Sequence, residues 1–200
     1  MPIVMFWRFE LNSLLKFIAK KALKTFGWNL KIILPEENKF VLIGAPHTSN
    51  WDFPLALLAF WSVDIKIHWI GKNQLFRGPL YYFLTALGGI PVNRKSSHGV
   101  IEQIKDRFNH AEQMVLAIAP EGTRSKVEYW KSGFYYIALA AKVPICFGYI
   151  DYSTRTLGFH RLIQPSGDIE KDMELISEFY QNIAGKYPHK QGPLRIRSKF

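Results

Sequence analysis

Residues 40–52 read FVLIGAPHTSNWD, an apolar run followed by a proline and a polar stretch that ends in an aspartate. An uninterrupted apolar run is typical of a strand that is buried on both faces. Pro46 ends the run, because proline has no backbone N–H to give to a sheet. The polar residues after His47 favour a turn or a helix start. We therefore expect a strand over 39–45 and a helix over 52–61.

The same stretch places an imidazole, His47, five positions before a carboxylate, Asp52. A hydrogen bond from one ring nitrogen to that carboxylate would fix the tautomer and leave the other nitrogen free as a base. A base oriented in this way at a strand end is what the deprotonation of a hydroxyl group requires. A local structural hydrogen bond is the commoner role of such a pair, so on these two residues alone both interpretations stay open.

The composition indicates one globular domain with a sizeable core and anionic partners. The chain has 200 residues, 48% of them hydrophobic, and a net charge of +10. Lipid headgroups, phosphorylated substrates, acidic carrier proteins and nucleic acid all suit that charge. Cys146 is the single cysteine. An intrachain disulfide is therefore impossible, which is typical of a reducing compartment.

The basic residues gather at the two ends of the chain. Residues 1–31 hold six basic residues and one acidic residue, and residues 185–200 hold five basic residues and no acidic one. On a helical wheel of residues 3–26, one broad face is apolar and three lysines lie opposite it. The apolar face contains Ile3, Val4, Trp7, Leu11, Leu14, Leu15, Ile18, Ala22 and Phe26. The opposite face carries Lys16, Lys20 and Lys24, interrupted by Phe9, Phe17 and Leu23.

This pattern predicts an amphipathic helix at the surface of an anionic membrane. A helix that packs on the core with solvated lysines is the alternative. We expect two parts, a membrane-associating segment over residues 1–30 and an α/β domain over 31–200. No stretch reaches the ~20 apolar residues that a spanning helix needs, and Arg8 and Glu10 interrupt the start too early for a secretory signal. The expected location is cytoplasmic, peripheral on the inner face of the cell membrane.

Strand-like and helix-like patterns alternate along the rest of the chain. Strands are predicted over 39–45, 66–71, 115–119, 143–150 and, more weakly, 156–163. Helices are predicted over 52–61, 74–87, 97–112, 131–142 and 168–184. Alternation of this kind predicts a single α/β domain with a largely parallel or mixed central sheet flanked by helices and preceded by the amphipathic helix. Sites in such folds lie beyond the carboxyl ends of strands, so we expect His47, Lys72 and Glu121 to converge.

Two further blocks carry polar groups. Residues 120–124 read PEGTR and follow an apolar strand. The glycine permits a tight turn, and Arg124 offers a planar donor fork that suits phosphate. A polar turn with a structural Glu–Arg pair is an equally open interpretation of this block. Residues 88–94 read GGIPVNR and end in Arg94, which by itself indicates only a surface arginine.

Together these blocks resemble the glycerolipid acyltransferase family, above all the 1-acylglycerol-3-phosphate (lysophosphatidic acid) acyltransferases. The His-x4-Asp motif of that family matches His47 and Asp52. Its second and third motifs match residues 88–94 and 120–124, and its lysine-bearing segment matches Lys72. The resemblance covers about residues 40–165 and includes a proline-opened strand over 143–145. Pro46, Asn93 and Ala119 depart from the usual residues of the family and leave the acyl acceptor open.

The resemblance implies transfer of a fatty acyl group from acyl-CoA or acyl-carrier protein to the free hydroxyl of a lysolipid in phospholipid biosynthesis. It implies no covalent acyl-enzyme, no cofactor beyond the acyl donor and no metal. His47 would be the base, Asp52 would orient it, and Lys72 or backbone N–H groups near it would stabilise the oxyanion. The acceptor's glycerol phosphate would be held by Arg94, Glu121, Gly122, Thr123, Arg124 and Lys131.

Other functions fit parts of the sequence. An acyltransferase for a different lysolipid has the same motifs. A non-catalytic membrane-binding protein could share the fold, although the presence of both His47 and Asp52 argues against it. A nucleic-acid binder is suggested by the charge alone, and the sequence shows no motif of that class, so we expect no nucleic-acid partner.

Overall fold

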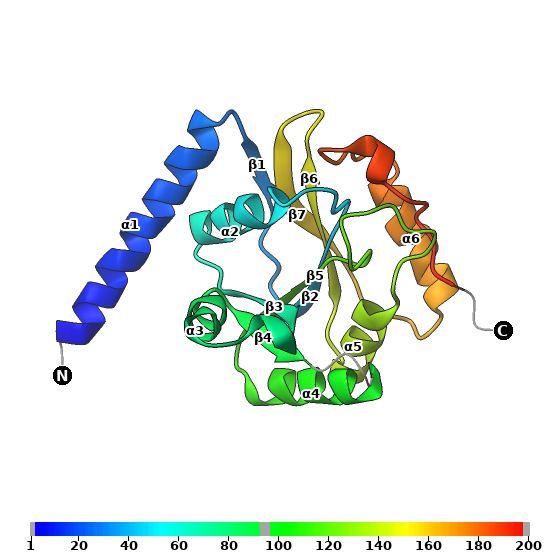
Figure 1. Ribbon diagram of the computed structural model, residues 1–200, viewed down its shortest axis with the longest axis horizontal. Helices are drawn as coiled ribbons and strands as arrows, with labels where there is room; N and C mark the ends of the chain where they lie inside the picture. Colours follow the sequence, from blue (N-terminus) through cyan, green and yellow to red (C-terminus); the bar gives the residue numbers. More distant parts are fainter. Residues whose placement is uncertain (1–2, 93–96, 198–200) are drawn as a thin grey trace.

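The computed structural model describes residues 3–92 and 97–197, and Arg94 lies outside them. In the described part of the chain, strands form one seven-stranded sheet in the order β1-β7-β6-β2-β5-β3-β4 (Figure 1). The strands are β1 Asn29–Ile32, β2 Lys39–Gly44, β3 Ile67–Lys72, β4 Gly89–Val92, β5 Met114–Ile118, β6 Ile145–Asp151 and β7 Thr156–Ile163. The α-helices are α1 Ile3–Thr25, α2 Asp52–Ser62, α3 Pro79–Ala86, α4 Ser97–His110, α5 Gly133–Ala141 and α6 Ile169–Tyr180. Short 3-10 helices occupy η1 Asn73–Leu75 and η2 Pro188–Lys190.

The sheet is mixed and mainly parallel. β6, β2, β5, β3 and β4 run in one direction, each parallel to its neighbour. β7 follows β6 as an antiparallel hairpin partner, and β1 pairs parallel with β7 at the edge. The predicted fold class, a single α/β domain with a largely parallel or mixed sheet and an N-terminal helix, is therefore confirmed.

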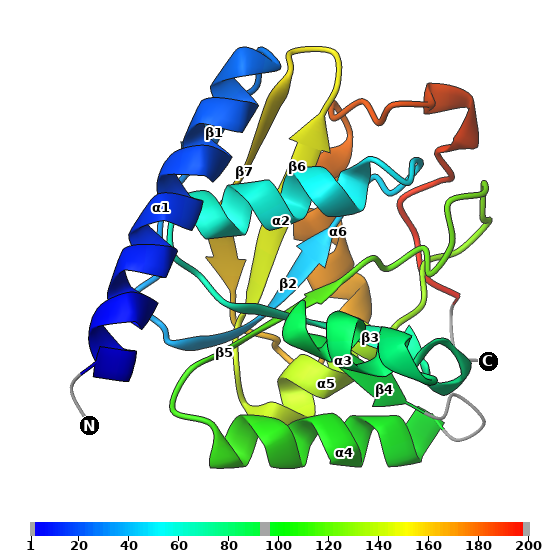
Figure 2. The ribbon, with the colours of Figure 1, turned by 60° about the vertical axis from the view of Figure 1, so that its left-hand side comes forward.

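Two layers of helices bury the two faces of β2, which explains its uninterrupted apolar sequence. Val41 and Ile43 pack into one core cluster with side chains of α4, α5 and α6. Phe40 and Leu42 point to the opposite face, where they pack against α2. Figure 2 shows α2 lying across the front of the sheet, with α6 behind it. Because alternate residues of a strand point to opposite faces, both sets must be apolar.

Two local predictions differ from the structure. The helix predicted over 74–87 is divided into η1 and α3 by Gly78, which has a φ of +54° and precedes Pro79. A proline at the first position opens a helix but cannot continue one, so α3 starts there. The strand β1 was not predicted. It has only four residues, and its exposed and half-buried positions alternate, so it lacks the apolar run that indicates a buried strand.

α1 packs on the domain through a narrow strip. Ala19 and Leu23 are buried, and Leu23 shares a cluster with Leu55 and Ala59 of α2. Leu23, which interrupts the lysine face of the helical wheel, therefore lies on the side of α1 that packs on the domain. Within the part of α1 whose side chains are described, the broad predicted apolar face is the exposed one, with Ile18 49% exposed. The division of the chain at residue 30 stays a prediction, and β1 spans that position.

Candidate active site

The site is built where two neighbouring strands end. β2 and β5 run parallel, with Ile43 opposite Ile118, so the loops that follow them begin side by side. The loop after β2 carries His47, and the loop after β5 carries Glu121. The backbone N–H of His47 donates a hydrogen bond to Oε1 of Glu121 at 3.0 Å. This bond joins two of the sequence motifs directly.

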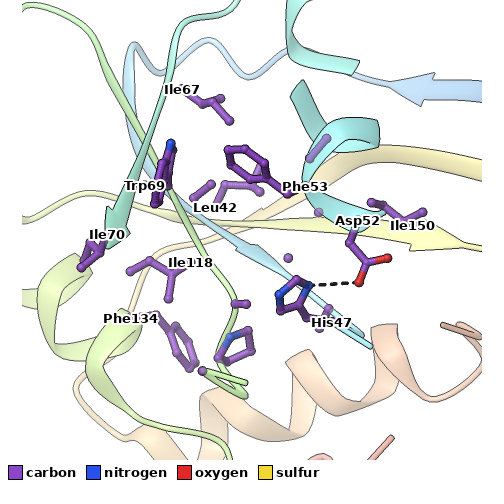
Figure 3. A pocket seen from close by; sticks show the side chains of 18 of the residues that line it. Leu42, His47, Asp52, Phe53, Ile67, Trp69, Ile70, Ile118, Phe134 and Ile150 are labelled. Carbon is purple, nitrogen blue, oxygen red and sulfur yellow. Dashed lines mark hydrogen bonds and ion pairs between the residues drawn. The ribbon is translucent and has the colours of Figure 1, made fainter. Parts of the chain in front are cut away.

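The predicted pairing of His47 with Asp52 is confirmed. Nδ1 of His47 lies 3.0 Å from Oδ2 of Asp52 (Figure 3). Asp52 is the first residue of α2 and is buried, and its Oδ2 also accepts hydrogen bonds from the N–H groups of Thr48 and Ser49, each at 2.9 Å. The chain between the two residues therefore folds around the carboxylate and fixes it. With Nδ1 as donor, the imidazole presents Nε2 as an acceptor.

Tyr152 also binds Asp52, a contact that no sequence motif indicated. Its hydroxyl donates to Oδ1 of Asp52 at 2.8 Å from the turn between β6 and β7. Burial alone would raise the pKa of the Asp52 carboxyl, but hydrogen bonds from His47, the Ser49 amide and Tyr152 outweigh burial and lower that pKa below its ordinary value. Asp52 is therefore a carboxylate at neutral pH and can stabilise a protonated His47.

Glu121 is a buried carboxyl group with a different environment. Burial raises its pKa above the ordinary value, and the hydrogen bond from the His47 amide only partly opposes this. Oε2 of Glu121 has no hydrogen-bond partner among the described residues. Glu121 thus positions the backbone at His47 through Oε1. Its Oε2 is buried without a partner among the described residues, as expected of an atom that contacts a polar group of a bound ligand.

A pocket of about 800 Å³ opens beside His47. Its inner part is apolar and runs between α2 and the sheet, where Leu42, Phe53, Ile67 and Trp69 point toward one another (Figure 3). Its lining also includes Gly122, Thr123 and Arg124 from the loop after β5, together with Lys131. The pocket can therefore hold a long apolar group next to a base, with two cations in the same lining.

Gly122 is required by the turn that brings Lys131 to the pocket. Its φ is +66°, which side chains rarely adopt, and a Cβ here would lie 2.9 Å from Nζ of Lys131. The backbone N–H of Lys131 also donates to the carbonyl of Pro120 at 2.9 Å. The PEGTR motif and Lys131 are thus folded onto each other, as a shared binding role would require.

One predicted residue, Lys72, is not brought to the site, and Arg94 cannot be placed. Lys72 ends β3, is exposed and is not among the described residues that line the pocket. β5 separates β3 from β2, which keeps the end of β3 away from His47. Arg94 cannot be placed, because it lies outside the described residues. The catalytic and binding roles that the sequence analysis assigned to the site residues stay predictions.

Among the described residues, no helix has the length and apolar character that crossing a membrane requires. In the same part of the chain, no three histidine, cysteine or acidic side chains gather as metal ligands would. The expectation that the reaction needs no metal and no cofactor beyond the acyl donor stays a prediction.

Comparisons with known proteins point in the same direction as the site. The fold is similar to that of the crystal structure of the 1-acyl-sn-glycerophosphate (LPA) acyltransferase PlsC from Thermotoga maritima. The TM-score is 0.58 at 17% sequence identity, over 85% of this chain and 77% of that one. A comparison with curated proteins finds no significant match. A family profile described as "Acyltransferase" matches residues 28–147, which include His47, Asp52 and the PEGTR motif. With more than half of its length matched, the chain belongs to the acyltransferase family of enzymes.

Proposed function

We propose that this acyltransferase moves a fatty acyl group from acyl-CoA or acyl-carrier protein to the free hydroxyl of a lysolipid, with 1-acylglycerol-3-phosphate as the first candidate. The observation that carries the proposal is the position of His47, a base held by Asp52 beside a pocket whose lining is mainly apolar and includes the cations Arg124 and Lys131. An acyl chain suits the apolar part and a phosphate suits Arg124 and Lys131. The similarly folded PlsC, itself an LPA acyltransferase, is consistent with this acceptor.

The reaction needs one base and no covalent intermediate. Nε2 of His47 takes the proton of the acceptor hydroxyl while the oxygen attacks the thioester carbon. The C–S bond of the resulting tetrahedral intermediate breaks, and the leaving thiolate takes the proton back from the imidazolium. Asp52 stabilises that imidazolium through the bond to Nδ1. Lys72 was expected to stabilise the oxyanion; its exposed position leaves backbone N–H groups at the pocket as the other candidates.

We further propose that the protein works on the inner face of the cell membrane, held there by α1. Leu14, Phe17 and Ile18 are exposed while Ala19 and Leu23 hold the helix on the domain, so one side of α1 is left to contact lipid. Exposed apolar groups with lysines beside them suit the boundary between headgroups and acyl chains. A membrane-bound acceptor would then reach the pocket without leaving the bilayer surface.

The test is acyl transfer to a panel of lysolipids, measured by thiol release from an acyl-CoA and from an acyl-carrier protein. His47→Ala should abolish transfer, and His110→Ala, at an exposed histidine in the last turn of α4, should not. Lys131→Ala should raise the KM of a phosphate-bearing acceptor about 10-fold or more and leave that of a phosphate-free acceptor unchanged. A folded His47→Ala protein with wild-type turnover would overturn the mechanism, and vesicle binding without any transfer would favour a non-catalytic membrane protein.

A further inference from the structure

A second hollow, of about 300 Å³, adjoins the main pocket. Asn50 and Arg124 line both of them, whereas His47 lines only the main pocket. The hollow is otherwise lined by Thr48, Ser49 and Trp51 from the turn after β2 and by Tyr187 and Lys190 from the C-terminal segment. The two hollows are therefore neighbours, with Asn50 and Arg124 lying between them.

The C-terminal segment is held against this turn by specific contacts. The backbone N–H of Tyr187 donates to Oγ1 of Thr48 at 3.2 Å, a bond between residues 139 positions apart. Gly185 lies so close that a Cβ there would be 2.7 Å from the same hydroxyl. Its N–H also donates to the side chain of Gln191 at 2.8 Å. The position of Lys190 at the hollow is thus fixed by the fold of residues 185–191.

The hollow carries positive charge without a counter-ion. None of its lining residues is acidic, and in the described part of the chain Arg124, Lys186 and Lys190 make no ion pair. Nζ of Lys190 lies 4.7 Å from the centre of the Tyr187 ring, and Nζ of Lys186 lies 5.3 Å from that of Trp51. Cations that gather at a concave surface without acidic partners attract anions. With Thr48, Ser49 and Asn50 as further polar groups, a phosphate is the anion that fits.

We propose that this hollow binds the phosphate of the phosphopantetheine arm, the group that acyl-CoA and acyl-carrier protein share. The assignment rests on the proposed function. The phosphate of a glycerol phosphate acceptor is only a few bonds from the hydroxyl that must reach His47, so it belongs in the main pocket near Lys131. The phosphate of the donor is separated from its thioester by the whole pantetheine chain. It therefore belongs in the hollow that His47 does not line, across Arg124 from the reacting carbon.

Three donors with the same acyl chain test this assignment: acyl-CoA, acyl-phosphopantetheine and acyl-pantetheine, which has no phosphate. Lys190→Ala should raise the KM of both phosphate-bearing donors about tenfold and leave kcat and the KM of acyl-pantetheine unchanged. The fold-change is at the low end for a charge-assisted hydrogen bond, because Lys190 is partly exposed. Lys190→Arg should retain most of the affinity. Lys171→Ala, at an exposed lysine in α6, is the matched control and should change nothing.

Each other outcome overturns the assignment in a distinct way. Equal KM increases for acyl-pantetheine would exclude a phosphate contact, and an increase only in the KM of the lysolipid would assign the hollow to the acceptor. An increase for acyl-CoA without one for acyl-phosphopantetheine and acyl-carrier protein would assign it to the nucleotide phosphates. Calorimetry with phosphopantetheine itself needs no turnover, so it separates this proposal from the proposed function. Binding that Lys190→Ala weakens about tenfold supports the hollow even if no acceptor is found, and no binding to the wild-type chain refutes it.

Discussion

Asn in place of Asp52 is the sharpest test of the site, because it keeps nearly every contact and removes the charge. The N–H groups of Thr48 and Ser49, each 2.9 Å from Oδ2, both need an acceptor there. The amide oxygen of Asn must take that place, where it still accepts from Nδ1 of His47. The amide nitrogen then takes the place of Oδ1 and donates to the hydroxyl of Tyr152, which can turn to accept. We therefore expect Asp52→Asn to preserve the tautomer of His47 and to lose only the electrostatic contribution.

The size of that contribution follows from the distance between Nδ1 and Oδ2, which is 3.0 Å. Two unit charges at this separation attract each other by about 5 kcal/mol at an effective dielectric constant of about 20. The attraction exists only once His47 has taken the proton, so it stabilises the transition state rather than the resting enzyme. The His47 side chain is 23% exposed, and water weakens the attraction. We expect kcat to fall by about 10²–10⁴-fold.

The assay is the steady-state rate of thiol release from acyl-CoA in the presence of lysophosphatidic acid, with thermal unfolding measured in parallel. Asp172→Asn is the matched control, because Asp172 and Asp52 are each 5% exposed. Asp172 accepts hydrogen bonds from the hydroxyl of Tyr135 at 2.8 Å and from the N–H of Ser166 at 2.7 Å, away from the pocket. It should lose comparable stability and keep its kcat. A folded Asp52→Asn enzyme within about threefold of wild-type kcat would refute the electrostatic role of Asp52.

Tyr152→Phe removes one hydrogen bond from Asp52 and keeps the ring, so kcat should fall about 3- to 10-fold at unchanged KM; full activity would show that the backbone amides hold the carboxylate unaided. Burial raises the pKa of Glu121 above 4.5, so this group contributes stability at low pH that is lost as pH rises through its folded-state pKa. The free energy of unfolding of Glu121→Gln, relative to wild type, should therefore increase in denaturant titrations as the pH rises from below 4.5 through the folded-state pKa of Glu121; a constant difference would contradict the shift. Phe17 and Ile18 are 61% and 49% exposed, so replacing both with Ser should weaken sedimentation with anionic vesicles at unchanged thermal stability. Undiminished sedimentation would place membrane contact elsewhere.

Features that depend on neighbours along the chain could be predicted from the sequence. The apolar run at residues 40–45, the proline after it and the polar turn before Asp52 each act over a few residues, so strand, turn and helix start could be predicted. The pairing of His47 with Asp52 belongs to this class, because one short turn closes around the carboxylate. The regular alternation of strands and helices was likewise enough to predict an α/β domain.

Contacts between distant residues depend on the order of the strands. Tyr152 binds Asp52 although 100 positions separate them in the sequence, and no pattern indicated this contact. Glu121 was expected near His47, and it holds the His47 backbone because β5 is the neighbour of β2. Lys72 also ends a strand, yet it does not reach the pocket, since β5 lies between its strand and that of His47. Strand order and the crossovers that produce it are long-range choices, settled by which apolar faces pack together. A motif can therefore name a residue for a site, but only the order of the strands brings that residue to it.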